Sequence, residues 1–375
     1  MVDLQGQYQR MKPDIDTAIS EVIQNASFIN GPAVALFAKE LADFNHVKHV
    51  VPCANGTDAL QLAMMALELK PGDEVIVPAF TYVATAEVIA LLGLTPVFVD
   101  VDPDTFQVSV EEIQKNITFK TKAIVPVHLF GQCADMEAIM AIASKHNIYV
   151  IEDTAQAIGA AYMFSDGTVK KAGTIGHIGT TSFFPSKNLG CYGDGGAIFV
   201  NDDELAAKLK MIANHGQRVK YYHDIIGVNS RLDTLQAAIL RTKLPHLDEF
   251  SSRRNASAAF YDAELGKYQS ISIPVRAHNS SHVFHQYTLK CHGFDREDLR
   301  SFLQAKGIPT MVYYPVPLHQ QKAYSHYESR NENLRVSEQL CSQVLSLPIH
   351  TEQEQAELSF ITETIKEFLQ SKGLN

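Results

Sequence analysis

DALQLAMMALELKPGDEVIVP, residues 58–78, contains in one piece the pattern that repeats along the first half of the chain. Residues 58–69 carry apolar side chains at helical spacing, at Leu60, Ala63, Met64 and Leu67. The PGDE sequence at 71–74 has the composition of a turn, and the EVIVP run at 74–78 is almost wholly apolar. A short apolar run next to an amphipathic helix is typical of a strand that is buried on both faces.

The same kind of run recurs through the first half of the chain, at 95–100 (TPVFVD), 122–127 (KAIVPV) and 148–152 (IYVIE). Two further strand-like runs follow at 180–184 and 197–200, separated by the glycine-rich LGCYGDGG. Helices that alternate with buried strands predict an α/β fold with a mainly parallel sheet.

The second half of the chain has a different pattern. A long helical region covers 233–265 with a break predicted at Pro245, a strand is predicted at 287–290, and a helix at 296–306. A proline-rich segment, YYPVPLH at 313–319, precedes two more helices. We predict a large domain over residues 1–250 and a smaller α+β domain over 251–375.

The composition excludes several classes of protein. The 375 residues are 46% hydrophobic and 20% charged, which excludes a disordered or coiled-coil chain. A formal net charge of −10 disfavours nucleic acid as a general partner. The five scattered cysteines predict reduced thiols, and no apolar run is long enough for a membrane span. The expected setting is therefore soluble and cytoplasmic, without a membrane partner.

The sequence Asn55-Gly-Thr-Asp58 comes directly before the first helix of the quoted segment. Backbone N–H groups at a helix N-terminus attract anions, and glycine allows a close approach. This pattern predicts a phosphate-binding turn, and a plain helix cap by Asn55 or Thr57 is the alternative.

The sequence Glu152-Asp-Thr-Ala-Gln156 comes at the end of a predicted strand. Ligands of open α/β sheets bind outside the carboxyl ends of the strands, so that an acid at position 153 is well placed for chemistry. The alternative is that Asp153 only caps a following helix.

A single lysine, Lys187, lies in TSFFPSKNLG at 181–190, between an aromatic strand and a glycine-rich turn. Lysine is normally a solvated surface residue, but an apolar site disfavours its charged form and leaves the amine needed for Schiff-base chemistry. The following LGCYGDGG has the wrong spacing for a dinucleotide loop and precedes a strand, not a helix.

These three segments complement one another. A phosphate turn, a strand-end aspartate and a buried lysine are what pyridoxal phosphate (PLP) needs: the lysine binds its aldehyde and the aspartate keeps its pyridine nitrogen protonated. Phe80-Thr-Tyr82, at the end of another strand, offers an aromatic ring to stack on the cofactor.

The chain resembles the DegT/DnrJ/EryC1/StrS sugar aminotransferases. The resemblance covers nearly the whole chain and rests on these motifs: GP (31–32), NGTDAL (55–60), PGDEVIVPAFTYVATAE (71–87), TPVFVDVDPDTF (95–106), VHLFGQCADM (127–136), IEDTAQAIGA (151–160), SFFPSKNLGCYGDGGAIFVNDDEL (182–205), NHGQ (214–217), GVNSRLDTLQAAIL (227–240) and YPVPLH (314–319). It implies the fold-type-I, aspartate-aminotransferase-like architecture, with a mainly parallel seven-stranded sheet between helices.

The resemblance also implies roles for individual residues. Lys187 would be the catalytic, Schiff-base-forming lysine, Asp153 the partner of the pyridine nitrogen, Gln156 a neighbour of the phenolic oxygen and Tyr82 the stacking ring. Phosphate contacts would come from Gly56, Thr57, Ser182 and, from the partner subunit of a homodimer, Asn229. Contacts to the substrate would come from Arg231, Tyr313, Tyr314 and His319.

The reaction implied is amino transfer from glutamate to a nucleotide-linked keto sugar, with Lys187 moving the proton. Some relatives carry histidine at this position and dehydrate their sugars, so lysine argues for amino transfer. The motifs are most similar to the branch that aminates C3 of UDP-2-acetamido-2-deoxy-3-oxo-glucuronate for surface polysaccharides such as the lipopolysaccharide O-antigen.

Several alternatives stay open. The substrate could be a dTDP-linked 3- or 4-keto-6-deoxy sugar, and relatives commonly have His-Tyr-Pro where this chain has Tyr313-Tyr314-Pro315. A non-catalytic cofactor-binding regulator of the same fold is a further alternative. Arg231 either binds a carboxylate or supports its own turn, and Arg218 and Lys220 either meet a diphosphate or lie in a solvated loop. None of the 15 histidines has the spacing of a metal site, so no metal is predicted.

Overall fold

A computed structural model describes residues 1–327 and 334–374. A seven-stranded sheet in the order β1-β9-β8-β5-β4-β2-β3 forms its centre. Only β9 among these strands runs antiparallel to its neighbours β8 and β1. The strands are β1 (His49–Cys53), β2 (Glu74–Pro78), β3 (Thr95–Val99), β4 (Thr121–Ile124), β5 (Tyr149–Asp153), β8 (Ile178–Ser182) and β9 (Gly196–Val200). The predicted α/β fold with a mainly parallel sheet is confirmed.

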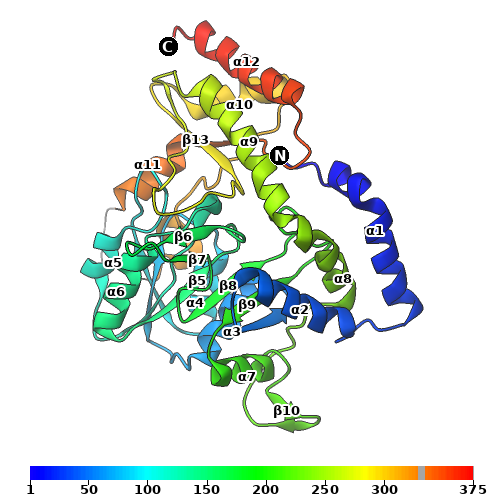
Figure 1. The fold of residues 1–375 in the computed structure, drawn as a ribbon. Coiled ribbons are helices and arrows are strands. Elements are labelled where there is room, and N and C mark those ends of the chain that lie inside the picture. The colour runs from blue at the N-terminus through cyan, green and yellow to red at the C-terminus, as the bar shows by residue number, and fades with distance from the viewer. Residues whose placement is uncertain (328–333, 375) are drawn as a thin grey trace.

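Helices enclose this sheet on both faces (Figure 1). The helices of this part of the chain are α1 (Leu4–Gln24), α2 (Pro32–Asn45), α3 (Gly56–Ala66), α4 (Ala84–Leu91), α5 (Val110–Asn116), α6 (Met136–His146), α7 (Asp203–Ile212) and α8 (Thr234–Lys243). Helix α1 packs on α8 rather than on the sheet. Strand β2 explains the apolar run of the sequence. Val75 and Val77 pack with α3, α4 and α7, whereas Ile76 packs with α5 and α6 on the other face.

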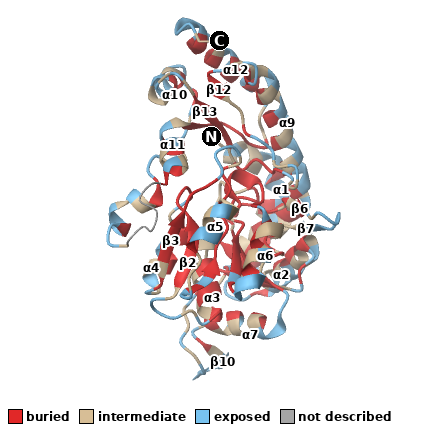
Figure 2. Ribbon diagram, turned by 90° about the vertical axis from the view of Figure 1, so that its left-hand side faces the viewer, coloured by how far each residue is buried: buried red, intermediate tan, exposed pale blue. Residues whose placement is uncertain are grey.

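A second apolar core lies at the top of the view in Figure 1. It is built on a three-stranded sheet in the order β12-β13-β14, and its buried residues stand out in Figure 2. The elements are α9 (Leu247–Leu265), β12 (Ile271–Ser272), β13 (Tyr287–Cys291), α10 (Arg296–Ala305), α11 (Arg335–Gln343), β14 (Val344–Leu347) and α12 (Gln355–Ser371). Residue 250 lies inside α9, and the division of the chain at that residue stays a prediction.

Short elements complete the fold. Two small antiparallel pairs are β6 (Ala161–Met163) with β7 (Val169–Lys171), and β10 (Gln217–Val219) with β11 (Tyr222–His223). Short 3₁₀ turns occur at Leu129–Gly131, Leu244–His246, Leu318–Gln320 and Lys322–Tyr324. The predicted break at Pro245 is the turn between α8 and α9.

Three predicted elements have a boundary that is wrong by two residues or more. The strand expected at 122–127 ends at Ile124, because Pro126 has no N–H to donate to a neighbouring strand. The strand expected at 180–184 covers 178–182, and the helix expected from residue 58 begins at Gly56.

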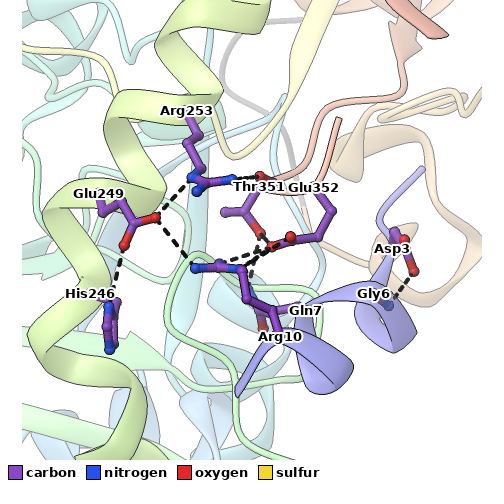
Figure 3. A network of polar contacts seen from close by, with 9 residues as sticks. All are labelled: Asp3, Gly6, Gln7, Arg10, His246, Glu249, Arg253, Thr351 and Glu352. Atoms are coloured by element: carbon purple, nitrogen blue, oxygen red, sulfur yellow. Dashed lines mark hydrogen bonds and ion pairs between the residues drawn. The ribbon is translucent and has the colours of Figure 1, made fainter. Parts of the chain in front are cut away.

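Helix α1 is joined to α9 and to the segment before α12 by a polar network (Figure 3). The Arg10 guanidinium donates to Glu352 at 2.9–3.1 Å and to Glu249 at 3.3 Å. Arg253 donates to Glu249 at 2.9 Å and to the Thr351 carbonyl at 3.3 Å. These pairs are partly solvated, so they orient α1 more than they stabilise the fold.

Asp100, directly after β3, caps α11 across the fold. Its carboxylate accepts hydrogen bonds from the backbone N–H groups of Val336 (2.9 Å) and Ser337 (2.7 Å), and from the Ser337 hydroxyl (2.6 Å). A carboxylate at a helix N-terminus satisfies donors that the helix itself cannot satisfy.

Replacing this cap gives the first prediction. Asp100→Ala should lower the free energy of unfolding by about 1–3 kcal/mol, because it leaves buried N–H groups unpaired. Denaturant unfolding followed by circular dichroism measures the change. Asp43→Ala, which removes an exposed pair with Lys39, is the control and should leave the midpoint nearly unchanged. Equal midpoints for the two variants would contradict the role given to Asp100.

Candidate active site

Asp153 is the last residue of β5 and only 6% of its surface is exposed. One carboxylate oxygen accepts from the Thr85 hydroxyl at 2.8 Å, and the other accepts from the Ala155 N–H at 3.1 Å. Residues 154–159 contain no helix, so the alternative that Asp153 caps a helix was wrong. The carboxylate is therefore held in one orientation at the carboxyl end of the sheet.

Lys187 lies in the loop between β8 and β9, and its backbone N–H donates to the Phe184 carbonyl at 2.8 Å. Burial disfavours the ammonium form and lowers the pKa of Lys187 to about 8, although the Asp153 carboxylate acts in the opposite direction. The two residues thus belong to one site. A lowered pKa makes a larger share of neutral amine available near pH 8, and the neutral amine is the nucleophile.

A second lysine with a lowered pKa, Lys243, is distinguished from Lys187 by its contacts. Burial lowers the pKa of Lys243 to about 8 as well. Its ammonium, however, donates to the Gly190 carbonyl at 2.8 Å and lies 4.4 Å from the centre of the Tyr192 ring. Only 1% of Lys243 is exposed. Lys243 therefore supports the loop that carries Lys187.

The N-terminus of α3 has the geometry of an anion site. The Asn55 side chain accepts from the Asp58 N–H at 2.8 Å, so the cap predicted as the alternative is present. The N–H groups of Gly56 and Thr57, in the first turn, have no acceptor within the helix itself. A Cβ at Gly56 would lie 2.7 Å from the Ser182 Cβ, which places Ser182 against the turn and requires glycine there.

Gln156 and two tyrosines lie near this site. The Gln156 amide oxygen accepts from the Phe130 N–H at 2.8 Å, and its amide nitrogen donates to the Tyr314 hydroxyl at 3.1 Å. The rings of Tyr314 and Tyr82 are 6.3 Å apart, and Tyr82 is 57% exposed. Tyr313 packs edge-on against Tyr314 at 5.8 Å. An exposed aromatic ring beside a polar cluster is suited to covering a flat ligand.

The other predicted residues have different surroundings. Asn229 is exposed, while its neighbour Ser230 accepts from the Ala54 N–H at 3.1 Å. Arg231 is half-buried. The His319 ring lies 3.2 Å from the Glu338 carboxylate.

Arg218 and Lys220 lie at the β10–β11 hairpin and the turn between its strands. Arg218 pairs with Asp224 at 2.8 Å, and the Lys220 ammonium lies 5.2 Å from the Tyr221 ring. Their contact with a diphosphate stays a prediction.

Sequence reasoning did not assign a role to three residues around Asp153. Thr85 donates to its carboxylate, and His128 and Glu152 form a buried pair beside its backbone. The IED motif and the VHLFG motif contain two of them, but only the folded chain shows that they meet.

These residues fit pyridoxal phosphate. Gly56 lets the N-terminus of α3 lie against Ser182, because a Cβ at position 56 would be 2.7 Å from the Ser182 Cβ, and this brings the backbone N–H groups of the turn next to the Ser182 hydroxyl. Lys187 supplies an amine with a lowered pKa, and Asp153 supplies a fixed carboxylate. Over the described ranges 1–327 and 334–374, the structure has no helix suited to span a membrane and no group of three metal-ligating side chains.

Comparison with known proteins gives close relatives over the whole chain. The UDP-2-acetamido-2-deoxy-3-oxo-D-glucuronate aminotransferase of Pseudomonas aeruginosa is 48% identical, over 96% of this chain and 97% of that protein. The "Pleiotropic regulatory protein" of Geobacillus stearothermophilus is 46% identical, over 98% of both. The dTDP-3-amino-3,4,6-trideoxy-alpha-D-glucose transaminase of Streptomyces venezuelae is 41% identical, over 95% of this chain and 92% of that protein.

A solved structure agrees with both the fold and the cofactor. The crystal structure of NtdA from Bacillus subtilis with bound cofactor PMP superimposes with a TM-score of 0.89. It is 34% identical, over 96% of this chain and 82% of that chain. The model of the family described as "DegT/DnrJ/EryC1/StrS aminotransferase family" matches residues 9–366 of the chain. The chain therefore belongs to the DegT/DnrJ/EryC1/StrS aminotransferase family of PLP-dependent enzymes.

Proposed function

We propose that this aminotransferase moves an amino group from glutamate to C3 of UDP-2-acetamido-2-deoxy-3-oxo-glucuronate, for surface polysaccharide synthesis such as that of the O-antigen. Amino transfer is supported by one observation above all: the amine of Lys187, whose pKa is lowered to about 8, and the fixed carboxylate of Asp153 lie close enough to interact. The choice of sugar is supported by the relative at 48% identity, which is named for that substrate.

We assign the site residues roles that follow from their chemistry. PLP, when bound, supplies an aldehyde that condenses with amines and a ring that withdraws electrons from the bond being broken. Gly56, Thr57 and Ser182 bind its phosphate, and Tyr82 covers its ring. Asp153 holds a proton on the pyridine nitrogen, Gln156 donates toward the phenolic oxygen, and Lys187 removes and returns the proton at the reacting carbon.

The substrate contacts are part of the same proposal. Arg231 binds the uronate carboxylate, because a guanidinium binds a carboxylate through two parallel hydrogen bonds. Tyr313, Tyr314 and His319 line the sugar side of the site. The family resemblance implies a histidine where this chain has Tyr313, and a relative at 41% identity is named for a dTDP-linked sugar, so a dTDP-linked keto-6-deoxy sugar is kept as the second candidate. A purely regulatory role is disfavoured by the lowered pKa of the Lys187 amine beside the Asp153 carboxylate.

We further propose a cytoplasmic homodimer with shared sites. Asn229 is exposed in the single chain and lies next to Ser230, which is bound to the segment before α3. A two-fold interface would bring each Asn229 to the phosphate of the partner's site.

The Lys187→Ala variant tests amino transfer. It should lower kcat about 10²–10⁴-fold, because the proton at the reacting carbon then has no acceptor in the site. Turnover of glutamate with UDP-2-acetamido-2-deoxy-3-oxo-glucuronate is measured, and an unchanged thermal midpoint controls for folding. A variant that keeps more than a tenth of the wild-type rate would contradict the assignment.

The pH dependence of cofactor capture tests the lowered pKa. Capture of PLP by the cofactor-free protein needs the neutral amine, so its rate should rise with pH about a midpoint near 8. In Asp153→Asn the midpoint should fall, because the carboxylate that favours the ammonium form is gone. A midpoint that stays or rises in this variant would show that the two groups do not interact.

Mixed dimers test the shared site. Lys187→Ala and Asn229→Ala subunits are unfolded and refolded together. In a hybrid dimer one site carries both defects and the other carries neither, so activity should reappear above that of either parent. Mixtures that stay at the average of the two parents would place Asn229 in its own subunit's site, or in none.

The substrate is decided by direct comparison. Glutamate is supplied with UDP-2-acetamido-2-deoxy-3-oxo-glucuronate and, separately, with dTDP-linked 3- and 4-keto-6-deoxy sugars. We expect the UDP uronate to have the highest kcat/KM, and Arg231→Lys to raise KM for it more than for the dTDP sugars. A preference for a dTDP sugar would replace the proposed substrate with the second candidate.

A further inference from the structure

The carboxylate of Glu152 is fully buried and accepts four hydrogen bonds. One oxygen accepts from the backbone N–H groups of Ile175 at 2.7 Å and Gly176 at 2.5 Å. The other accepts from the Gly173 N–H at 2.9 Å and from the His128 ring at 2.9 Å. Glu152 and His128 are both 0% exposed. Such a carboxylate has each oxygen satisfied by two donors and stays in one position.

The hydrogen bonds of His128 define its tautomer. Its Nδ1 accepts from the Ala134 N–H at 3.1 Å, so Nε2 carries the ring proton and donates it to Glu152. The backbone N–H of His128 donates to the Asp153 carbonyl at 3.0 Å, and the Asp153 N–H donates to the Pro126 carbonyl at 2.9 Å. His128 thus touches both Glu152 and the backbone of Asp153.

The turn that surrounds Glu152 leads directly into β8. Gly173 has a φ of +84°, and a Cβ at Gly176 would lie 2.9 Å from the Val150 carbonyl oxygen. The His177 ring accepts from the Val150 N–H at 3.0 Å. The turn is therefore held against β5. Strand β8 follows the turn and ends at Ser182, where the loop that carries Lys187 begins.

This arrangement fixes the register of β5 and β8, in which Asp153 lies opposite Thr180. A slip of one residue would displace Ser182 by about 3.3 Å relative to Asp153 and would turn its side chain to the other face. Asp153 and Ser182 would then no longer be placed so that one cofactor molecule could reach both.

We propose that Glu152 and His128 are positioning residues that set Asp153 against the loop of Lys187 and so orient the bound cofactor. The inference rests on the role of Asp153 in the proposed function. A pair that served only stability would leave the orientation of the cofactor unchanged when it is weakened.

The experiment compares His128→Leu, which removes the donor to Glu152, with His128→Gln, whose amide can still donate from a similar position. Tyr261→Phe is the matched control, because it removes a buried hydroxyl in the other core that donates to the Pro348 carbonyl at 2.9 Å and accepts from the Gln353 amide at 3.0 Å. Each protein is stripped of cofactor and titrated with PLP. The apparent Kd, the visible circular dichroism per bound cofactor and the thermal midpoint are recorded.

We expect His128→Leu to weaken PLP binding about tenfold, as loss of an orienting partner does around bound metals, and to change the visible circular dichroism. His128→Gln should restore most of both signals. Tyr261→Phe should lower the thermal midpoint and change neither. If His128→Leu does not fold, Glu152→Gln takes its place, because an amide cannot accept from all four donors.

Two outcomes would overturn the proposal. In the first, His128→Leu, or Glu152→Gln in its place, lowers the thermal midpoint while its apparent Kd for PLP and its visible circular dichroism match those of the wild type. In the second, His128→Gln folds and shows the same cofactor defect as His128→Leu. Failure of the wild-type protein to bind PLP would instead overturn the roles proposed for Asp153 and Lys187.

Discussion

The amine of Lys187 lies beside the carboxylate of Asp153, and the rest of the site is arranged around that pair. Burial lowers the pKa of the amine, and the carboxylate limits how far it falls. The balance leaves a lysine that exchanges protons near neutral pH, which is what a group that both attacks and carries protons requires. A fully solvated lysine would stay protonated, and its amine would be a poor nucleophile.

The sheet brings this pair together. Strand β5 ends at Asp153. Strand β8 ends at Ser182, and the loop that follows it carries Lys187. Helix α3 begins at Gly56, which lies against Ser182. Parallel strands present their carboxyl ends at one edge, so groups distant in sequence meet there. The buried pair of Glu152 and His128 sets the register of this edge, and Thr85 orients the Asp153 carboxylate. Asp153 and Ser182 are therefore each fixed at the end of a mostly buried strand.

The sequence predicted the elements whose periodicity is local. Strand β2 was found because Val75, Ile76 and Val77 are apolar on both faces. The prediction displaces strand β8 because Gly179 interrupts its apolar run, while the aromatic Phe183 and Phe184 lie beyond its end. Hydrogen bonds between distant segments, such as those of Thr85 and His128, leave no periodic signal. Motifs could suggest Asp153 and Lys187, but only the fold shows the groups that hold them.

The central claim is that the cofactor is bound to Lys187 and not to Lys243, although the pKa of each lysine is lowered to about 8. Borohydride reduction of the holoenzyme, followed by proteolysis and mass spectrometry, locates the fixed cofactor directly. A single phosphopyridoxyl group on the peptide that contains Lys187 is the predicted result. An adduct on Lys243, or no covalent adduct in a protein that retains its cofactor before reduction, would contradict the account.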